Sequence, residues 1–250
     1  MYNNYGLQNE VELENAINGK RFSELNENLQ RMVTQLFGHL NDSDVLACRR
    51  TDNYIKPDIV VSCRGKDCYI SVKCNHSKFM HTESIKSFVM FLRSLGISEE
   101  TQKTLLLFQY GDGTMNGTGE IRMNRNQVYD WLAERITNAN RELNNRLDFI
   151  EKVVNRVVFQ GVDLVADSAD YIYDGTVDYG IIVSKRQVRS YLKRGDWHFY
   201  DNIHIGPIMM RPHARYANRA IVSDERRNHI MCSWANFDQE MQFIAKHFAF

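Results

Sequence analysis

Three polar residues between positions 57 and 73 have the side chains needed for metal-assisted hydrolysis. Asp58 lies in the β-rich run 57–62, and Ser71 and Lys73 lie in the run 68–73, after a turn that contains glycine. This pattern predicts a β-hairpin. In such a site a carboxylate holds Mg²⁺, which polarises a phosphate and lowers the pKa of a bound water. An ammonium group would orient that water or stabilise negative charge.

The alternation of side chains along the hairpin predicts one polar and one apolar face. A turn centred between Gly65 and Lys66 places Asp58 directly opposite Lys73, with Ser71 on the same face. Directly opposed residues have Cβ atoms roughly 5 Å apart. The other face would carry the four apolar residues Ile59, Val61, Ile70 and Val72. The alternative is a cross-strand salt bridge on an exposed sheet, which contributes little to stability.

Pro57-Asp58 followed by Ser71-Val72-Lys73 resembles the motif of the PD-(D/E)XK nuclease superfamily, over about residues 20–110. The resemblance implies a restriction-endonuclease-like α/β fold, a mixed β-sheet flanked by helices, extended here by a C-terminal α+β segment. It also implies that Asp58 binds a metal, that Lys73 assists the attacking water and that the Val72 carbonyl is a further metal ligand. The implied cofactor is Mg²⁺, with Mn²⁺ as a substitute.

The sequence departs from the family pattern at Ser71, where the family has a second acid. In some restriction enzymes of the family the following helix supplies the missing carboxylate. Glu83 opens the helix predicted for residues 83–95 and is the expected substitute, as a catalytic residue and metal ligand, while Ser71 lines the site. Glu24 or Glu27 on an earlier predicted helix could hold the metal instead. A nuclease fold that has lost activity is a third explanation for Ser71.

Apolar periodicity and capping residues predict the elements around the hairpin. Helices are expected over residues 8–17, 23–38, 83–95, 126–157, 185–195 and 238–248. Further strands are expected over residues 45–50, 104–110, 171–173, 179–183, 204–211 and 229–234. The run 104–110 is nearly all apolar, as in a strand buried on both faces. We expect a nuclease-like core over residues 1–160 and a basic α+β segment over 161–250, joined in one continuous domain.

The zero net charge of the 250 residues is the sum of two oppositely charged parts. Residues 1–184 hold 20 basic and 25 acidic side chains, whereas residues 185–250 hold 11 and 6. A basic segment downstream of the motif favours contacts with DNA phosphates and bases, although many such runs are solvated surface. The candidate nucleic-acid ligands are Lys185, Arg186, Arg189, Arg211, Arg215, Asn218 and Arg219.

Other features have simpler explanations. Cys63, Cys68, Cys74 and His76 match no usual zinc spacing, and five cysteines in a chain of this size indicate reduced thiols and a cytoplasmic location. The glycine-rich segment 111–119 lacks the Lys-Ser/Thr of a P-loop. No apolar run is long enough for a membrane span, and we expect no signal peptide.

These features together predict a Mg²⁺-dependent endonuclease that cuts double-stranded DNA, in the manner of a sequence-specific type II restriction enzyme. A homodimer is expected because one active site cuts one strand. A repair nuclease and an RNA-cutting enzyme remain open. The alternative from another class is a non-catalytic nuclease-fold protein that binds DNA or a partner. A second carboxylate beside Asp58 and Lys73 would favour the enzyme.

Overall fold

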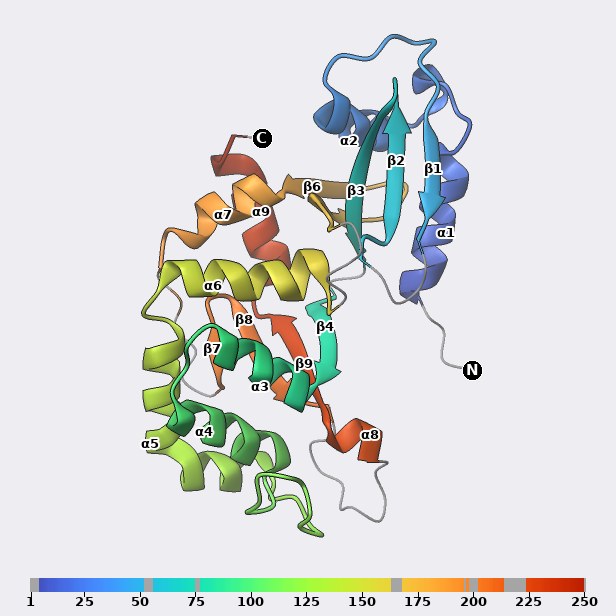
Figure 1. Ribbon diagram of the computed structural model, residues 1–250. Helices are drawn as coiled ribbons and strands as arrows, with labels where there is room; N and C mark the ends of the chain where they lie inside the picture. The colour runs from blue at the N-terminus through green and yellow to red at the C-terminus, as the bar shows by residue number, and fades with distance from the viewer. Residues whose placement is uncertain are drawn as a thin grey trace. The chain divides into compact units, whose positions relative to one another are not determined.

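The computed structural model describes residues 5–51, 56–74, 77–162, 168–195, 197, 202–213 and 224–249, in two compact units. Unit 1 comprises Met1–Lys78, Asn155–Arg194 and Asn236–Phe250, and unit 2 comprises Phe79–Val154 and Gly195–Ala235. Both units draw on residues before and after position 160, where the sequence analysis placed a boundary. Figure 1 shows the elements that build each unit.

Unit 1 is built on a five-stranded mixed sheet in the order β1-β2-β3-β5-β6, of which Figure 1 labels β1, β2, β3 and β6. β3 and β5 run parallel, and the other neighbours are antiparallel. The strands are β1 (Ala47–Arg50), β2 (Ile59–Cys63), β3 (Lys66–Lys73), β5 (Tyr171–Gly175) and β6 (Gly180–Ser184). The helices are α1 (Tyr5–Ile17), α2 (Glu27–Phe37), α7 (Lys185–Leu192) and α9 (Phe237–His247), with a 3₁₀ turn at Phe22–Glu24 and a π-helical turn at Asn155–Gln160.

The core of unit 1 lies between the hairpin and the first two helices. All four apolar residues predicted for one hairpin face belong to a single buried cluster, which confirms that prediction. Leu13 and Ile17 of α1 pack into the same cluster, as do Leu29 and Val33 of α2. α2 begins at its N-cap Asn26, whose side chain accepts from the Leu29 amide, rather than at Ser23 as predicted. Burial of these helix faces therefore fixes α1 and α2 against the strands that carry the motif.

The hairpin register differs by two residues from the prediction. Ser62 pairs with Asp67 and Cys63 with Lys66, so the turn is centred between Arg64 and Gly65. Both turn residues have positive φ, 51° and 75°, as a two-residue hairpin turn of the primed type requires. The shift keeps every side chain on its predicted face, because side chains alternate with a period of two.

Unit 2 is built on a four-stranded antiparallel sheet in the order β4-β9-β8-β7. The strands are β4 (Phe79–Ser84), β7 (His204–Ile205), β8 (Ile208–Pro212) and β9 (His229–Trp234). The helices are α3 (Ile85–Ser94), α4 (Glu99–Tyr110), α5 (Arg125–Leu143), α6 (Leu147–Val154) and the short α8 (Asp224–Arg227). Among the described residues, no helix is long and apolar enough to cross a membrane.

The prediction of a strand over residues 104–110 was wrong, because this run forms the second half of α4. Ser98 caps the helix by accepting from the Thr101 amide, and Gly111 ends it in the left-handed conformation. Leu105 and Phe108, three residues apart, are buried on one side. The second neighbour of β3 in the sheet, besides β2, is β5, about a hundred residues further along the chain. A short apolar run does not by itself distinguish a strand from a buried helix.

Candidate active site

Asp58 is held at the start of the hairpin by hydrogen bonds to two segments, β3 and Thr51. Its amide donates to the Ile70 carbonyl at 2.9 Å, and its carbonyl accepts from the Thr51 amide at 3.1 Å. Its carboxylate oxygen Oδ2 accepts from the Val72 amide at 2.6 Å and from Ser71 Oγ at 3.0 Å. These bonds leave Asp58 little freedom, which is the preorganisation that a catalytic carboxylate needs.

Lys73 lies beside Asp58 on the same face of the hairpin. Its Nζ is 3.8 Å from Asp58 Oδ2, and it donates to the Val72 carbonyl at 3.0 Å. The side chains of Lys73 and Asp58 are only 13% and 20% exposed, so this is not the solvated surface pair of the alternative explanation. The structure therefore brings together Asp58, Ser71 and Lys73 as the spacing predicted. Ser71, rather than Lys73, is the residue opposite Asp58, because of the changed register.

Glu10 of α1 is a second carboxylate that interacts electrostatically with Asp58 and Lys73, and it was not among the residues predicted from the sequence. Burial, and then the negative charge of Asp58, raise the pKa of Glu10 to about 7, while the cations Lys73 and Arg50 oppose that rise. Two carboxylates that repel each other beside a lysine are a group that a divalent cation would stabilise. A signal was present in the sequence, because Glu10 lies three and seven residues before the buried Leu13 and Ile17, on the apolar stripe of its helix.

The three acids expected from the sequence to complete the site belong to other elements than the hairpin. Glu83 does not open a helix, because it lies in β4 of unit 2, where it is buried and its Oε1 is 3.4 Å from His81 Nε2. Glu24 accepts from the Arg21 amide at the 3₁₀ turn, and Glu27 is exposed at the start of α2. A metal role for Glu83, Glu24 or Glu27 stays a prediction. Glu10 differs from these three acids because its charge interacts with that of Asp58.

Asp174 is a further acid on the neighbouring strand. The parallel pairing of β3 with β5 makes Asp174 the Cα partner of Lys73. Paired residues in neighbouring strands point to the same face of a sheet, so Asp174 belongs to the polar face that carries Asp58. No sequence pattern links it to the motif, because the pairing depends on a strand that the sequence analysis did not place next to β3.

The donor set of this site fits a hard divalent cation. Glu10 and Asp58 offer carboxylate oxygens, and the Val72 carbonyl retains a lone pair beyond the one that Lys73 uses. Mg²⁺ is commonly bound through one or two carboxylates and keeps several waters. In the described part of the chain, no three His, Cys, Asp or Glu side chains form a metal-binding group. The five cysteines are all free and buried.

The predicted nucleic-acid ligands are divided between the two units. Lys185, Arg186 and Arg189 lie on α7 in unit 1, and Arg211 lies on β8 in unit 2. Arg215, Asn218 and Arg219 lie outside the described residues, as does His76.

On α7, two of the three basic residues can face solvent. Arg186 and Arg189 are exposed, whereas Lys185 is partly buried with its Nζ 5.5 Å from the centre of the Phe159 ring. Burial, followed by the charge of Arg189, lowers the pKa of Lys185. The role of these residues in DNA binding stays a prediction.

No protein-family model and no curated protein matches the sequence. Among solved structures, the chain is similar to restriction endonuclease MspI, whose structure was determined in complex with its cognate DNA. The match covers 93% of this chain and 92% of the MspI chain, with a TM-score of 0.50 and 11% sequence identity. At this identity the likeness concerns the fold. With its five-stranded mixed sheet flanked by helices, the chain has the restriction-endonuclease-like fold that the motif predicted.

Proposed function

We propose that the protein is a Mg²⁺-dependent endonuclease that hydrolyses phosphodiester bonds of double-stranded DNA. The observation that carries the proposal is the group formed by Glu10 on α1 and by Asp58 and Lys73 on the hairpin, two interacting carboxylates and an ammonium in a nuclease-type fold. A non-catalytic binding protein would need no second acid at this place.

Each residue has a role that follows from its contacts. Glu10, Asp58 and the Val72 carbonyl would hold the metal. When bound, the metal would polarise the scissile phosphate and lower the pKa of a bound water. Lys73, fixed by the Val72 carbonyl and by Asp58, would orient the attacking water and stabilise the negative charge that develops on the phosphate. Ser71 would keep Asp58 oriented through its 3.0 Å hydrogen bond.

The test is a plasmid-cleavage assay with Mg²⁺ and with Mn²⁺, comparing the natural protein with the Asp58→Ala and Lys73→Ala variants. Both variants should lose cleavage. Asp67→Asn is the matched control, because Asp67 is an exposed acid of β3, the strand that carries Lys73. This variant should cut like the natural protein. Cleavage that persists unchanged in Asp58→Ala and Lys73→Ala would refute the assigned site. Duplex binding without cleavage by the natural protein would favour the binding-protein alternative.

Three finer statements belong to the same proposal. Sequence-specific cutting would produce discrete fragments in that assay. A homodimer would supply one active site for each strand, and its sedimentation should correspond to two chains. A cytoplasmic location would agree with five buried, reduced thiols.

Glu83 as a second metal ligand is tested by Glu83→Gln, which should leave cleavage intact if Glu10 has that role.

A further inference from the structure

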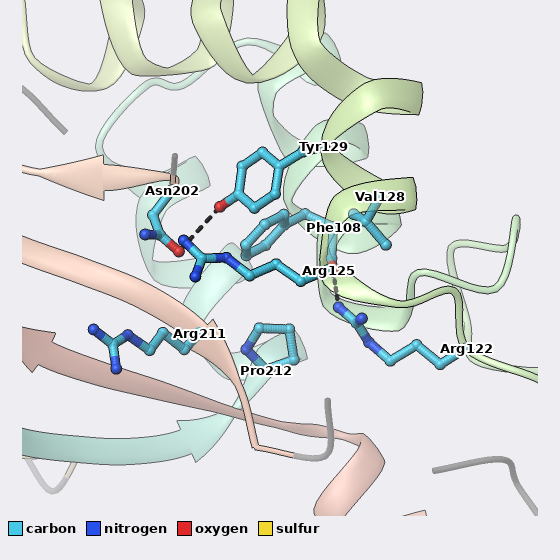
Figure 2. Close-up of a pocket in the computed structure, with 8 residues that line it drawn as sticks. All are labelled: Phe108, Arg122, Arg125, Val128, Tyr129, Asn202, Arg211 and Pro212. Carbon is cyan, nitrogen blue, oxygen red and sulfur yellow. Dashed lines mark hydrogen bonds between the residues drawn. The ribbon is translucent and has the colours of Figure 1, made fainter. Parts of the chain in front are cut away.

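Three arginine side chains from separate segments line one recess of unit 2 (Figure 2). Arg122 follows the glycine-rich loop, Arg125 begins α5, and Arg211 lies on β8. The other lining residues are Phe108, Val128, Tyr129, Asn202 and Pro212, so no lining residue is acidic. In Figure 2 the Arg125 and Arg211 side chains extend in the same direction, toward the side where Asn202 lies. We call this place the arginine recess.

Two of the three arginines, Arg122 and Arg125, are held in position by neighbouring groups. Arg122 donates to the carbonyls of Phe108 and Met123 at 2.9 Å and 3.0 Å. Arg125 lies over the Tyr129 ring, with Cζ 5.5 Å from the ring centre, and its side chain makes no ion pair with the described residues. Positioned guanidinium groups lose less entropy when they bind an anion.

Asn202 adds a polar donor to the recess. Its Oδ1 accepts from the Tyr129 hydroxyl at 3.0 Å, as Figure 2 shows, while its Nδ2 is 3.7 Å from the Met209 sulfur, a weak acceptor. The amide nitrogen can therefore donate to a stronger acceptor. Guanidinium and amide donors together suit an anion that has several oxygens, and a phosphate group is such an anion.

The size of the recess limits what can enter it. It leaves about 20 Å³ for the centres of water-sized groups, which is room for roughly one such group. A whole nucleotide cannot be enclosed there, but the oxygens of a phosphate that belongs to a larger molecule can reach the arginines. The apolar walls formed by Val128 and Pro212 would keep water away from one side, which strengthens the ionic contact.

We infer that the arginine recess binds one backbone phosphate of duplex DNA through Arg125 and Arg211, with Arg122 and Asn202 in support. This inference rests on the proposed function for the identity of the polymer. A phosphate contact fixes the position of DNA and carries no sequence information. The recess would therefore position the duplex, and bases would be read elsewhere.

The test measures fluorescence anisotropy of a labelled duplex in EDTA, which prevents metal-dependent cleavage, over a series of salt concentrations. The double variant Arg125→Gln/Arg211→Gln should bind roughly tenfold more weakly, with a log–log salt slope shallower by about 0.9 for the lost phosphate. Arg135→Gln is the matched control, because Arg135 is an exposed arginine of the same helix outside the recess, and it should bind like the natural protein. Arg125→Lys/Arg211→Lys should recover part of the affinity, since the charge remains without the two-pronged geometry.

Equal affinity and equal salt slope in the double variant and in Arg135→Gln would overturn the inference. Inorganic phosphate is the second arm. If it raises the melting temperature of the natural protein but not of the double variant, while duplex affinity is unchanged, the recess binds a free anion and the DNA assignment is wrong. Cleavage separates this inference from the proposed function. If binding depends on the recess but the natural protein does not cut DNA, the inference stands and the nuclease is refuted. If the natural protein cuts DNA but binding does not depend on the recess, the nuclease stands and the inference is refuted.

Discussion

Replacing Glu10 by Gln should make the metal-free protein more stable at pH 8 and destroy its cleavage activity. Burial and the charge of Asp58 raise the pKa of Glu10 from 4.5 to about 7. Between these two values the native protein retains a proton that the unfolded chain has released, so stability falls as the pH rises through that window. Above pH 7 the charged carboxylate opposes folding in full, whereas Gln avoids that cost because it is never charged.

The size of the effect follows from the pKa change. The rise from 4.5 to about 7 corresponds to roughly 3 kcal/mol at about 1.4 kcal/mol per pH unit. Glu10 is partly exposed, and solvent screening reduces this to about 1–2 kcal/mol. For a protein of this size, Glu10→Gln should then raise the melting temperature at pH 8 by about 2–8 °C. At pH 4.5 the two proteins should melt within about 1 °C of each other.

The assay is thermal denaturation in EDTA at both pH values, followed by the same measurement with Mg²⁺. Glu12→Gln is the matched control, because Glu12 is an exposed acid of the same helix, and its melting temperature should change little at either pH. Mg²⁺ should stabilise the natural protein at pH 8 by binding the native state, and should stabilise Glu10→Gln less. A Glu10→Gln variant that is no more stable than the natural protein at pH 8, or equally stabilised by Mg²⁺, would refute the assignment of Glu10 as the second acid.

Three further substitutions test separate parts of the structure. Lys73→Gln should lower the cleavage rate roughly 10²- to 10³-fold in a single-turnover assay, because it removes the charge beside the phosphate. Ser71→Ala should lower stability by about 1 kcal/mol in urea denaturation and reduce cleavage less than Lys73→Gln does, because the Val72 amide still holds Asp58. Asp112→Ala should cost about 3–5 kcal/mol, because it leaves the buried charge of Arg227 without its 3.0 Å partner. A stability loss under about 1 kcal/mol would show that this pair is not a buried support of the glycine-rich loop.

The local features of the candidate site were predictable from the sequence, and its long-range features were not. Alternation assigned Asp58, Ser71 and Lys73 to one face, and a two-residue error in register leaves that assignment intact. The register itself depends on Arg64, a non-glycine residue with a φ of 51°. Its side chain is held by Asp44, to which Nε donates at 3.0 Å, so a contact 20 residues away supports the turn. Nothing in the two strands alone contains that information.

The wrong assignment of residues 104–110 has a different cause. The run TLLLFQY is apolar enough for a buried strand, but the helix starts earlier, at Glu99, where Ser98 and two acidic residues favour a helix N-terminus. Extending the window to these capping residues would have predicted α4. Only the tertiary structure shows that β5 pairs with β3 on the side away from β2, which makes Asp174 the Cα partner of Lys73.

The charge division along the chain is a poor guide to the proposed DNA-binding surface. The basic segment 185–250 does not form one unit, because residues 185–194 and 236–250 belong to unit 1 and residues 195–235 to unit 2. In the arginine recess, Arg211 comes from that basic segment, whereas Arg122 and Arg125 come from the acidic first part. Tertiary structure therefore concentrates positive charge where no stretch of sequence does. If the protein binds DNA through such local sites, its affinity for DNA should fall only slowly as the salt concentration rises, because few phosphates are neutralised.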